Sequence, residues 1–251
     1  MQISRSTFLV FVVVVIVMTL SVTVFKDGGH SAVSQFRFQK TAQNPYEDRR
    51  DRYPTVESDD VEITDPLKRA KLKRQKKLFD KDAPFTNPGP KDEEVAFRPE
   101  AQFDFPALPV AKSDVIVIGQ VLEAEAHRSE NKMNVFSNFQ LRVDEVVKGN
   151  NLTVGSLITI GRIGGFVKYP SGRKVLFRLS GNGMPGIGAR YAFFLNASDE
   201  DFSILTAYEL GVEGVVPLDN SPQFKVYEGE SEAGFVKALR NAISQAVPQQ
   251  E

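Results

Sequence analysis

Apolar and polar side chains alternate along several segments in the second half of the chain, which is the pattern of strands buried on one face. In the segment 135–147, Val135, Phe139, Leu141 and Val143 share one face, and the other face is mainly polar. Similar runs between glycine-, proline- and asparagine-rich turns predict further strands at 114–121 (continuing through 125), 156–163, 166–169, 174–179, 191–195, 202–208, 214–218 and 223–227. Many short strands with frequent turns predict a mainly-β fold, either a small barrel or a sandwich.

A helical period replaces the alternation near the end of the chain. Phe235, Leu239 and Ile243 recur at every fourth residue, and Ser231 can cap a helix over 231–247. A stripe of this kind is apolar because it packs against other elements. We therefore expect a C-terminal α-helix that completes the core of a domain spanning residues 96–251.

The first 25 residues have a different character. The run 8–25 contains eighteen residues without a charge, and it would span about 27 Å as a helix, enough to cross a hydrocarbon core. Arg5 precedes this run, and positive charge is retained on the cytoplasmic side. The sequence therefore predicts a single-pass transmembrane signal anchor over 1–25, with the rest of the chain outside the cytoplasm. A cleaved signal peptide, followed by secretion, is the alternative.

Charged residues dominate the next segment. Residues 26–95 contain 15 basic and 14 acidic side chains and little apolar periodicity, so they cannot bury enough apolar surface to offset the entropy of ordering. We interpret 26–95 as a disordered linker that tethers the domain to the membrane.

One element is predicted inside this linker, a basic helix over 66–79. Asp65 is a good N-cap and Pro66 a good first residue. The run Lys68–Lys77 suits docking to an anionic surface, such as lipid headgroups or an acidic polymer. Alternatively, it is a solvated charge run that pairs loosely with the acidic residues before it.

Composition excludes several classes of chemistry. The chain has no cysteine and only two histidines, His30 and His127. Disulfides, thiolate zinc sites, cysteine nucleophiles and histidine-rich metal sites are thereby excluded or disfavoured. The net charge is -1, which gives no case for nucleic-acid binding. The glycine pattern at 181–186 matches a dinucleotide motif, but no helix is predicted to follow it. We expect no cofactor.

A series of strand ends and glycines resembles a known type of domain. The residues are Asp114-Val-Ile-Val-x-Gly-x-Val, Val143-x-Glu-Val-Val-Lys-Gly149, Ile158-x-Ile160 with Gly164-Gly165, and Gly188-x-x-Tyr191-x-x-Phe194-Leu195. Over 113–218 this series resembles extracytoplasmic bacterial domains of the OB-fold, netrin-like type. The resemblance implies a five-stranded barrel used for binding, and it brings no catalytic residues. The chain departs from the pattern between Gly165 and Gly188, where a hairpin is predicted instead of a helix.

Basic and aromatic residues gather around the predicted strands 156–163, 166–169 and 174–179. On an OB-like barrel such a face can bind an oligosaccharide or a nucleic acid. The alternative is an ordinary charged outer face. The candidate binding residues are Arg162, Phe166, Lys168, Tyr169, Arg173, Lys174 and Arg178.

We expect from these features a membrane-tethered extracytoplasmic binding module without catalytic activity, which engages an envelope protein or a glycan. The rival hypothesis is a hydrolase or enzyme-inhibitor-type domain that uses Glu123, Glu125 and His127. The two carboxylates share one face of a predicted strand.

Overall fold

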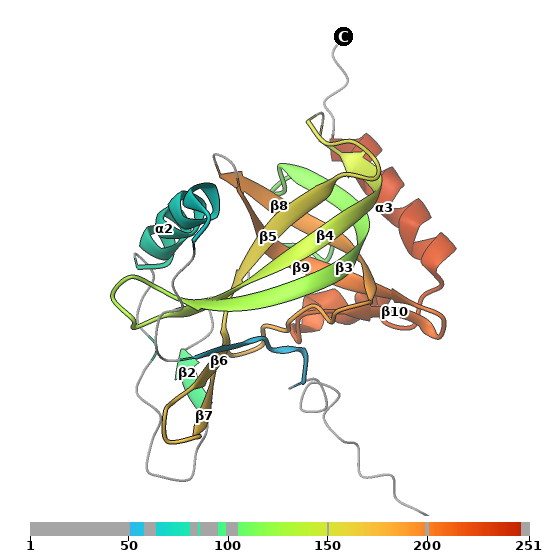
Figure 1. Ribbon diagram of the computed structural model, residues 1–251. Coiled ribbons are helices and arrows are strands. Elements are labelled where there is room, and N and C mark those ends of the chain that lie inside the picture. Colours follow the sequence, from blue (N-terminus) through green and yellow to red (C-terminus); the bar gives the residue numbers. More distant parts are fainter. Residues whose placement is uncertain are drawn as a thin grey trace, which may run out of the picture. The chain divides into compact units, whose positions relative to one another are not determined.

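Two long antiparallel strands form the centre of the fold. In the computed structural model, the alternating segment becomes β4 (Val135–Lys148), and the β-branched run before it becomes β3 (Val115–Arg128). Their pairing shifts register at three places, near Ile116, Ile118 and Val121. Irregularities of this kind bend a strand and increase its twist. Both strands accordingly curve strongly (Figure 1).

The structure describes only part of the chain, and the described residues belong to one compact unit within 42–251. The predicted membrane span over 1–25 lies outside them. Among the residues that are described, no helix combines the length and the apolar character needed to cross a membrane. The described residues are 51–57, 64–80, 85, 95–98, 105–149, 151–198 and 201–246.

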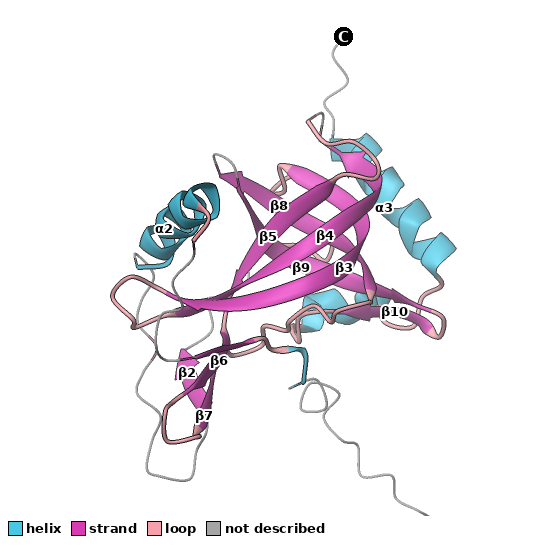
Figure 2. Cartoon of the chain, viewed as in Figure 1, coloured by secondary structure: helices cyan, strands magenta, loops and turns pink. Residues whose placement is uncertain are grey.

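Six strands form the larger sheet, in the order β10-β9-β5-β4-β3-β8. The remaining four are β5 (Leu157–Ile163), β8 (Arg190–Ser198), β9 (Asp201–Gly211) and β10 (Gly214–Pro217). Because β8 also pairs with β9, the pairings lead from β3 through β4, β5, β9 and β8 back to β3. Within this ring the β5–β9 pairing is parallel and the others are antiparallel. The predicted mainly-β fold is confirmed (Figure 2).

The main core lies on the face to which all five strands of the ring contribute. Fully buried side chains include Val117 from β3, Phe139 and Leu141 from β4, and Tyr191 and Phe193 from β8. On each of these strands, alternate side chains thus belong to the same apolar cluster. The alternation of apolar and polar residues in the sequence predicts this arrangement.

A second apolar cluster lies under the C-terminal helix α3 (Glu232–Ala246), which corresponds to the helix predicted over 231–247. Phe235 and Leu239 are fully buried. The ring of Phe235 lies 4.8 Å from the ring of Tyr208 on β9, centroid to centroid. The predicted packing of this helix on the sheet is therefore confirmed.

One predicted strand is wrong. Residues 223–227 lie in a 3₁₀-helix, η2 (Pro222–Tyr227), which buries Phe224. Pro222 stands in its first turn, where the fixed φ of proline favours a helix start and its missing N–H costs nothing. The apolar spacing of Phe224 and Val226 had suggested a strand instead.

The predicted hairpin at 166–179 is present as β6 (Gly165–Lys168) and β7 (Lys174–Leu179). Gly164 and Gly165, with φ of +116° and +150°, turn the chain from β5 into this hairpin. A side chain on Gly164 would lie 2.9 Å from the carbonyl oxygen of Phe177. Glycine is thus required at this corner both by the backbone angle and by the close approach.

Two short strands complete the smaller sheet, in the order β1-β6-β7-β2. β1 (Thr55–Glu57) pairs in parallel with β6, and β2 (Val95–Arg98) pairs in parallel with β7. Tyr53, just before β1, is only 8% exposed and belongs to the main core. The structure therefore differs from the predicted linker at 51–57. The segment is ordered by long-range pairing, for which a local sequence pattern carries no signal.

The basic helix predicted inside the linker is confirmed as α2 (Pro66–Asp80). Oδ1 of Asp65 accepts hydrogen bonds from the backbone N–H groups of Leu67, at 2.9 Å, and of Lys68, at 3.3 Å. Asp65 is thus the N-cap, as its position before Pro66 predicts.

Candidate functional site

Helix α2 lies against the polar outer face of β4 and its neighbours. Nδ2 of Asn138 on β4 donates a hydrogen bond of 2.8 Å to Oε1 of Gln75, which is 6% exposed. Nζ of Lys71 forms an ion pair of 2.8 Å with Oδ1 of Asp201 at the start of β9. The middle of the helix is thereby held by polar contacts.

The C-terminal end of α2 is fixed more firmly. The ring of Phe79 stacks on the ring of Phe136, with centroids 4.3 Å apart and planes inclined by 13°. Nδ2 of Asn134 donates to the carbonyl oxygen of Phe79 at 2.8 Å, and the N–H of Asn131 donates to Oδ1 of Asp80 at 3.0 Å. The turn between β3 and β4 thus holds this end of the helix.

A pocket of about 200 Å³ lies between the N-terminal half of α2 and the sheet. Its walls come from one helix and three adjacent strands, and most of its lining side chains are polar. They are Lys68, Lys71, Leu72, Gln75, Glu123, Ala124, Glu125, His127, Asn138, Phe139, Gln140 and Thr159.

The polar groups of this pocket offer both hydrogen-bond donors and acceptors. The side chain of Asn138 lines the pocket, and its Oδ1 is buried without a hydrogen-bond partner among the described residues. Glu123 and Glu125 are exposed and supply further acceptors. Lys68 and Gln140 supply donors from opposite walls. A ligand rich in hydroxyl groups can satisfy both kinds.

The environment of His127 strongly perturbs its titration. Its side chain is 15% exposed, and its ring centroid lies 5.4 Å from that of Phe136. Burial, and secondarily the charge of Lys76, lower the pKa of His127 to about 4. Nε2 lies 3.7 Å from Oε2 of Glu125, but the imidazole is neutral at pH 7. It can therefore donate one hydrogen bond and accept another.

The structure does not bring the predicted basic cluster together as an open binding face. Arg162 is only 4% exposed and forms a buried ion pair with Asp219. Nζ of Lys168 pairs with Oε1 of Glu57 on β1 at 2.9 Å. Arg162 was expected on the surface, but the end of β5 is covered on both faces, so its charge is neutralised internally.

The other predicted binding residues have separate roles. Phe166 contacts the ring of Tyr53 edge to face at 6.2 Å, and its N–H donates to the carbonyl oxygen of Pro54 at 2.8 Å. Tyr169 packs beside the apolar cluster of the β6–β7 hairpin. The residues Arg173, Lys174 and Arg178 follow on the hairpin, where the first two are exposed and the third is half-buried.

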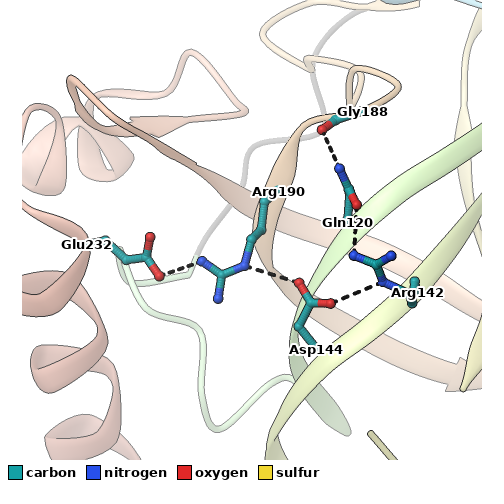
Figure 3. Close-up of polar contacts among 6 residues, drawn as sticks. All are labelled: Gln120, Arg142, Asp144, Gly188, Arg190 and Glu232. Atoms are coloured by element: carbon teal, nitrogen blue, oxygen red, sulfur yellow. Dashed lines mark hydrogen bonds and ion pairs between the residues drawn. The ribbon is translucent and has the colours of Figure 1, made fainter. Parts of the chain in front are cut away.

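A polar network on another part of the sheet serves to orient α3 (Figure 3). Arg190 on β8 donates to Oε1 of Glu232 at 2.5 Å and to Oδ2 of Asp144 at 3.2 Å. Arg142 continues the network, with hydrogen bonds to Asp144 at 3.4 Å and to Gln120 at 2.9 Å. These side chains satisfy one another, and we assign them a structural role.

Three of the sequence-predicted residues do meet in the pocket: Glu123, Glu125 and His127. The contribution of α2 to the site was missed, because a run of seven cations does not show which side faces a sheet. The polar face of 135–147, which carries Asn138 and Gln140, was the available signal. Among the described residues, no three histidine, aspartate or glutamate side chains are grouped so as to hold a metal ion.

The chain matches no model of a known protein family, and a search of curated proteins gives no significant match. The function must therefore be argued from the site itself.

Proposed function

We propose that this chain is a membrane-tethered extracytoplasmic binding module without catalytic activity, which engages an envelope glycan or protein. The observation that carries the proposal is the pocket between α2 and the sheet, where donors and acceptors from four elements converge. Asn138, Gln140 and Thr159 supply polar side chains on the sheet side of this pocket. The uncharged run at 8–25 supports the tether.

We further propose that the ring of strands is a small OB-like barrel. The pairing order β3–β4–β5–β9–β8–β3, with β5 and β9 parallel, supports this assignment. In OB-folds, the face of the second and third strands binds oligosaccharides and oligonucleotides. Here the second and third strands of the ring are β4 and β5, and they contribute Asn138, Gln140 and Thr159 to the pocket.

The pocket lining carries two carboxylates, Glu123 and Glu125, beside the lysines Lys68 and Lys71, so its charges balance and give no net attraction for a phosphate backbone. The exposed carboxylates can accept hydrogen bonds from sugar hydroxyls, which favours a glycan. The volume of about 200 Å³ is below that of most sites for drug-sized ligands. A single sugar unit of a longer polymer, or one side chain of a protein, is the expected occupant.

Isothermal titration with soluble envelope glycans tests this proposal. We expect N138L and Q140A to weaken binding at least tenfold, because each removes a polar group of the pocket floor. K237A, at an exposed position of α3, is the control and should bind as the native chain does. Glycan binding that is unchanged in both pocket variants would place the site elsewhere.

A second candidate function is hydrolysis, because Glu123, Glu125 and His127 line the same pocket. A pKa of about 4 makes His127 a weak general base at neutral pH, so we rank this candidate second. It predicts that bound glycan is shortened over time, and that E123Q or E125Q stops the shortening while leaving binding intact. If the native chain releases no shortened glycan, the result supports the binding module.

A further inference from the structure

Docking on the sheet divides the cations of α2 into two groups. Lys68 and Lys71 line the pocket, and Lys76 lies close enough to His127 to affect its charge. The remaining four are exposed to solvent, and we call them the outer cation stripe: Arg69, Lys73, Arg74 and Lys77.

The stripe has a regular helical geometry. Arg69, Lys73 and Lys77 follow one another at every fourth residue, so they form a row along one side of the helix, and Arg74 stands beside it. Consecutive members of the row are about 6 Å apart along the axis. Cations at this spacing gain nothing from one another and repel instead. The row therefore concentrates positive charge on the exposed side of α2.

Among the described side chains, the outer side of α2 carries little besides cations. Ala70 stands between them, and Pro66 and the large apolar Leu67, 82% exposed, stand in the first turn. Protein interfaces usually have a central apolar or aromatic anchor. A row of cations with one apolar residue at its end is instead typical of a helix that binds a diffuse anionic surface. The apolar residue can insert into that surface.

In the sequence, residues 26–50 stand between the predicted span and the first described residue, Asp51. These 25 residues reach at most about 85 Å when fully extended, and about 28 Å as the flexible coil that their composition predicts. A tether of this length keeps the stripe at a high effective concentration near the membrane.

We propose that the outer cation stripe docks on anionic lipid headgroups of the membrane that holds the predicted span. Each basic residue near such a surface contributes about fivefold to the docking equilibrium. Removal of all four charges should then weaken docking by at least about 100-fold. Docking of the outer side leaves the contacts of Gln75 and Phe79 on the inner side unchanged, and it does not depend on the pocket binding a glycan.

The experiment uses the full chain in lipid nanodiscs. Because the chain has no cysteine, A70C carries a single fluorescent label beside the stripe, and lipid-linked quenchers report its distance from the surface. We compare discs of phosphatidylcholine with discs that contain about one third phosphatidylglycerol. Quenching should be strong only in the anionic discs at low salt, and it should fall at 0.5 M salt, where the Debye length is about 4 Å.

The test variant carries R69Q, K73Q, R74Q and K77Q, since glutamine keeps the helix propensity. The control removes four exposed cations elsewhere on the domain and has the same net charge: K112Q, R173Q, K174Q and K237Q. We expect quenching to be lost in the test variant and kept in the control. Equal melting curves by circular dichroism show that both variants are folded.

Two results would overturn the proposal. One is equal quenching in neutral and anionic discs, or equal loss of quenching in both variants. The other is tight binding of the stripe to a soluble acidic polymer such as polyglutamate, together with no quenching in anionic discs. The glycan titration of the pocket is unaffected by either result, so the two proposals fail separately.

Discussion

Helices α2 and α3 each contain 15 residues, yet they are attached to the sheet by different kinds of contact. α3 buries Phe235 and Leu239 completely in an apolar cluster. α2 is held by a hydrogen bond from Asn138, an ion pair of Lys71 and one aromatic stack of Phe79. Complete burial of two large apolar side chains contributes more to stability than a few polar contacts and one half-buried aromatic stack do.

Two helices of equal length can therefore differ in how strongly their unfolding is coupled to unfolding of the core. α3 shares its apolar cluster with Ile116, Ile118 and Phe194 of the ring, so its loss would expose the sheet. α2 covers mostly polar side chains and the ring of Phe136, so its departure would expose less apolar surface than the loss of α3. We therefore expect α3 to unfold with the domain and α2 to open locally.

The largest expected effect is on α3. L239A removes a fully buried side chain and should lower the free energy of unfolding by about 2–5 kcal/mol. Chemical denaturation of a fragment spanning residues 42–251 measures this. K237A on the exposed side of the same helix should change it by a few tenths of a kcal/mol. An unchanged midpoint for L239A would show that the helix is not part of the core.

The second expected effect is a dependence of stability on pH that is caused by His127 in the pocket under α2. His127 has a pKa of about 4 in the folded chain and about 6.5 when unfolded. The unfolded state therefore binds more protons between these values, and stability falls as the pH is lowered from 6.5 to 4. The full loss is about 3 kcal/mol. The free energy of unfolding of the native chain and of H127Q is measured at pH 7 and at pH 4. The loss caused by His127 should be absent from H127Q, and equal losses in the two chains would contradict the assignment.

A smaller effect is expected from F79A, which removes the aromatic stack of α2. Phe79 is half-buried, so the cost should be about 1–3 kcal/mol and mainly local. Hydrogen exchange should accelerate for amides in 66–80 and stay slow in β4 and β8. Acceleration across the whole domain would instead mean that α2 is as cooperative with the core as α3.

The smallest effect is expected from K71A, which removes the partly exposed ion pair with Asp201. Such pairs contribute between about 0 and 1 kcal/mol. Hydrogen exchange of α2 in the native chain should depend on salt, and in K71A the dependence should be weaker. Equal salt dependence in both chains would show that the attachment of α2 rests on contacts other than this ion pair.

The elements that the sequence predicts well have a local period. β4 and α3 were found because alternation and helical spacing are readable within one segment. β1 and the buried Tyr53 were missed, because their order comes from a parallel pairing with β6, more than 100 residues further along the chain. A strand of three residues has too little pattern to be recognised alone.

The candidate site was predictable in part for the same reason. Glu123, Glu125 and His127 stand on one strand, and their proximity follows from the sequence. Arg162 was predicted as exposed, since its partner Asp219 lies 57 positions away and no local rule connects them. The inward side of α2 was equally hidden, because Gln75 is neutral among cations and its partner Asn138 belongs to another element.

The contacts of residues 52 and 53 have a mechanical consequence. Nη1 of Arg52 donates to Oε2 of Glu209 at 2.6 Å and to the hydroxyl of Tyr191 at 3.0 Å, and the Tyr53 hydroxyl donates to the carbonyl oxygen of Asn182 at 3.0 Å. These contacts precede β1 in the chain. A pull on the chain from the N-terminal side of Arg52 would therefore load β8 and β9 before it reached β1 or α2.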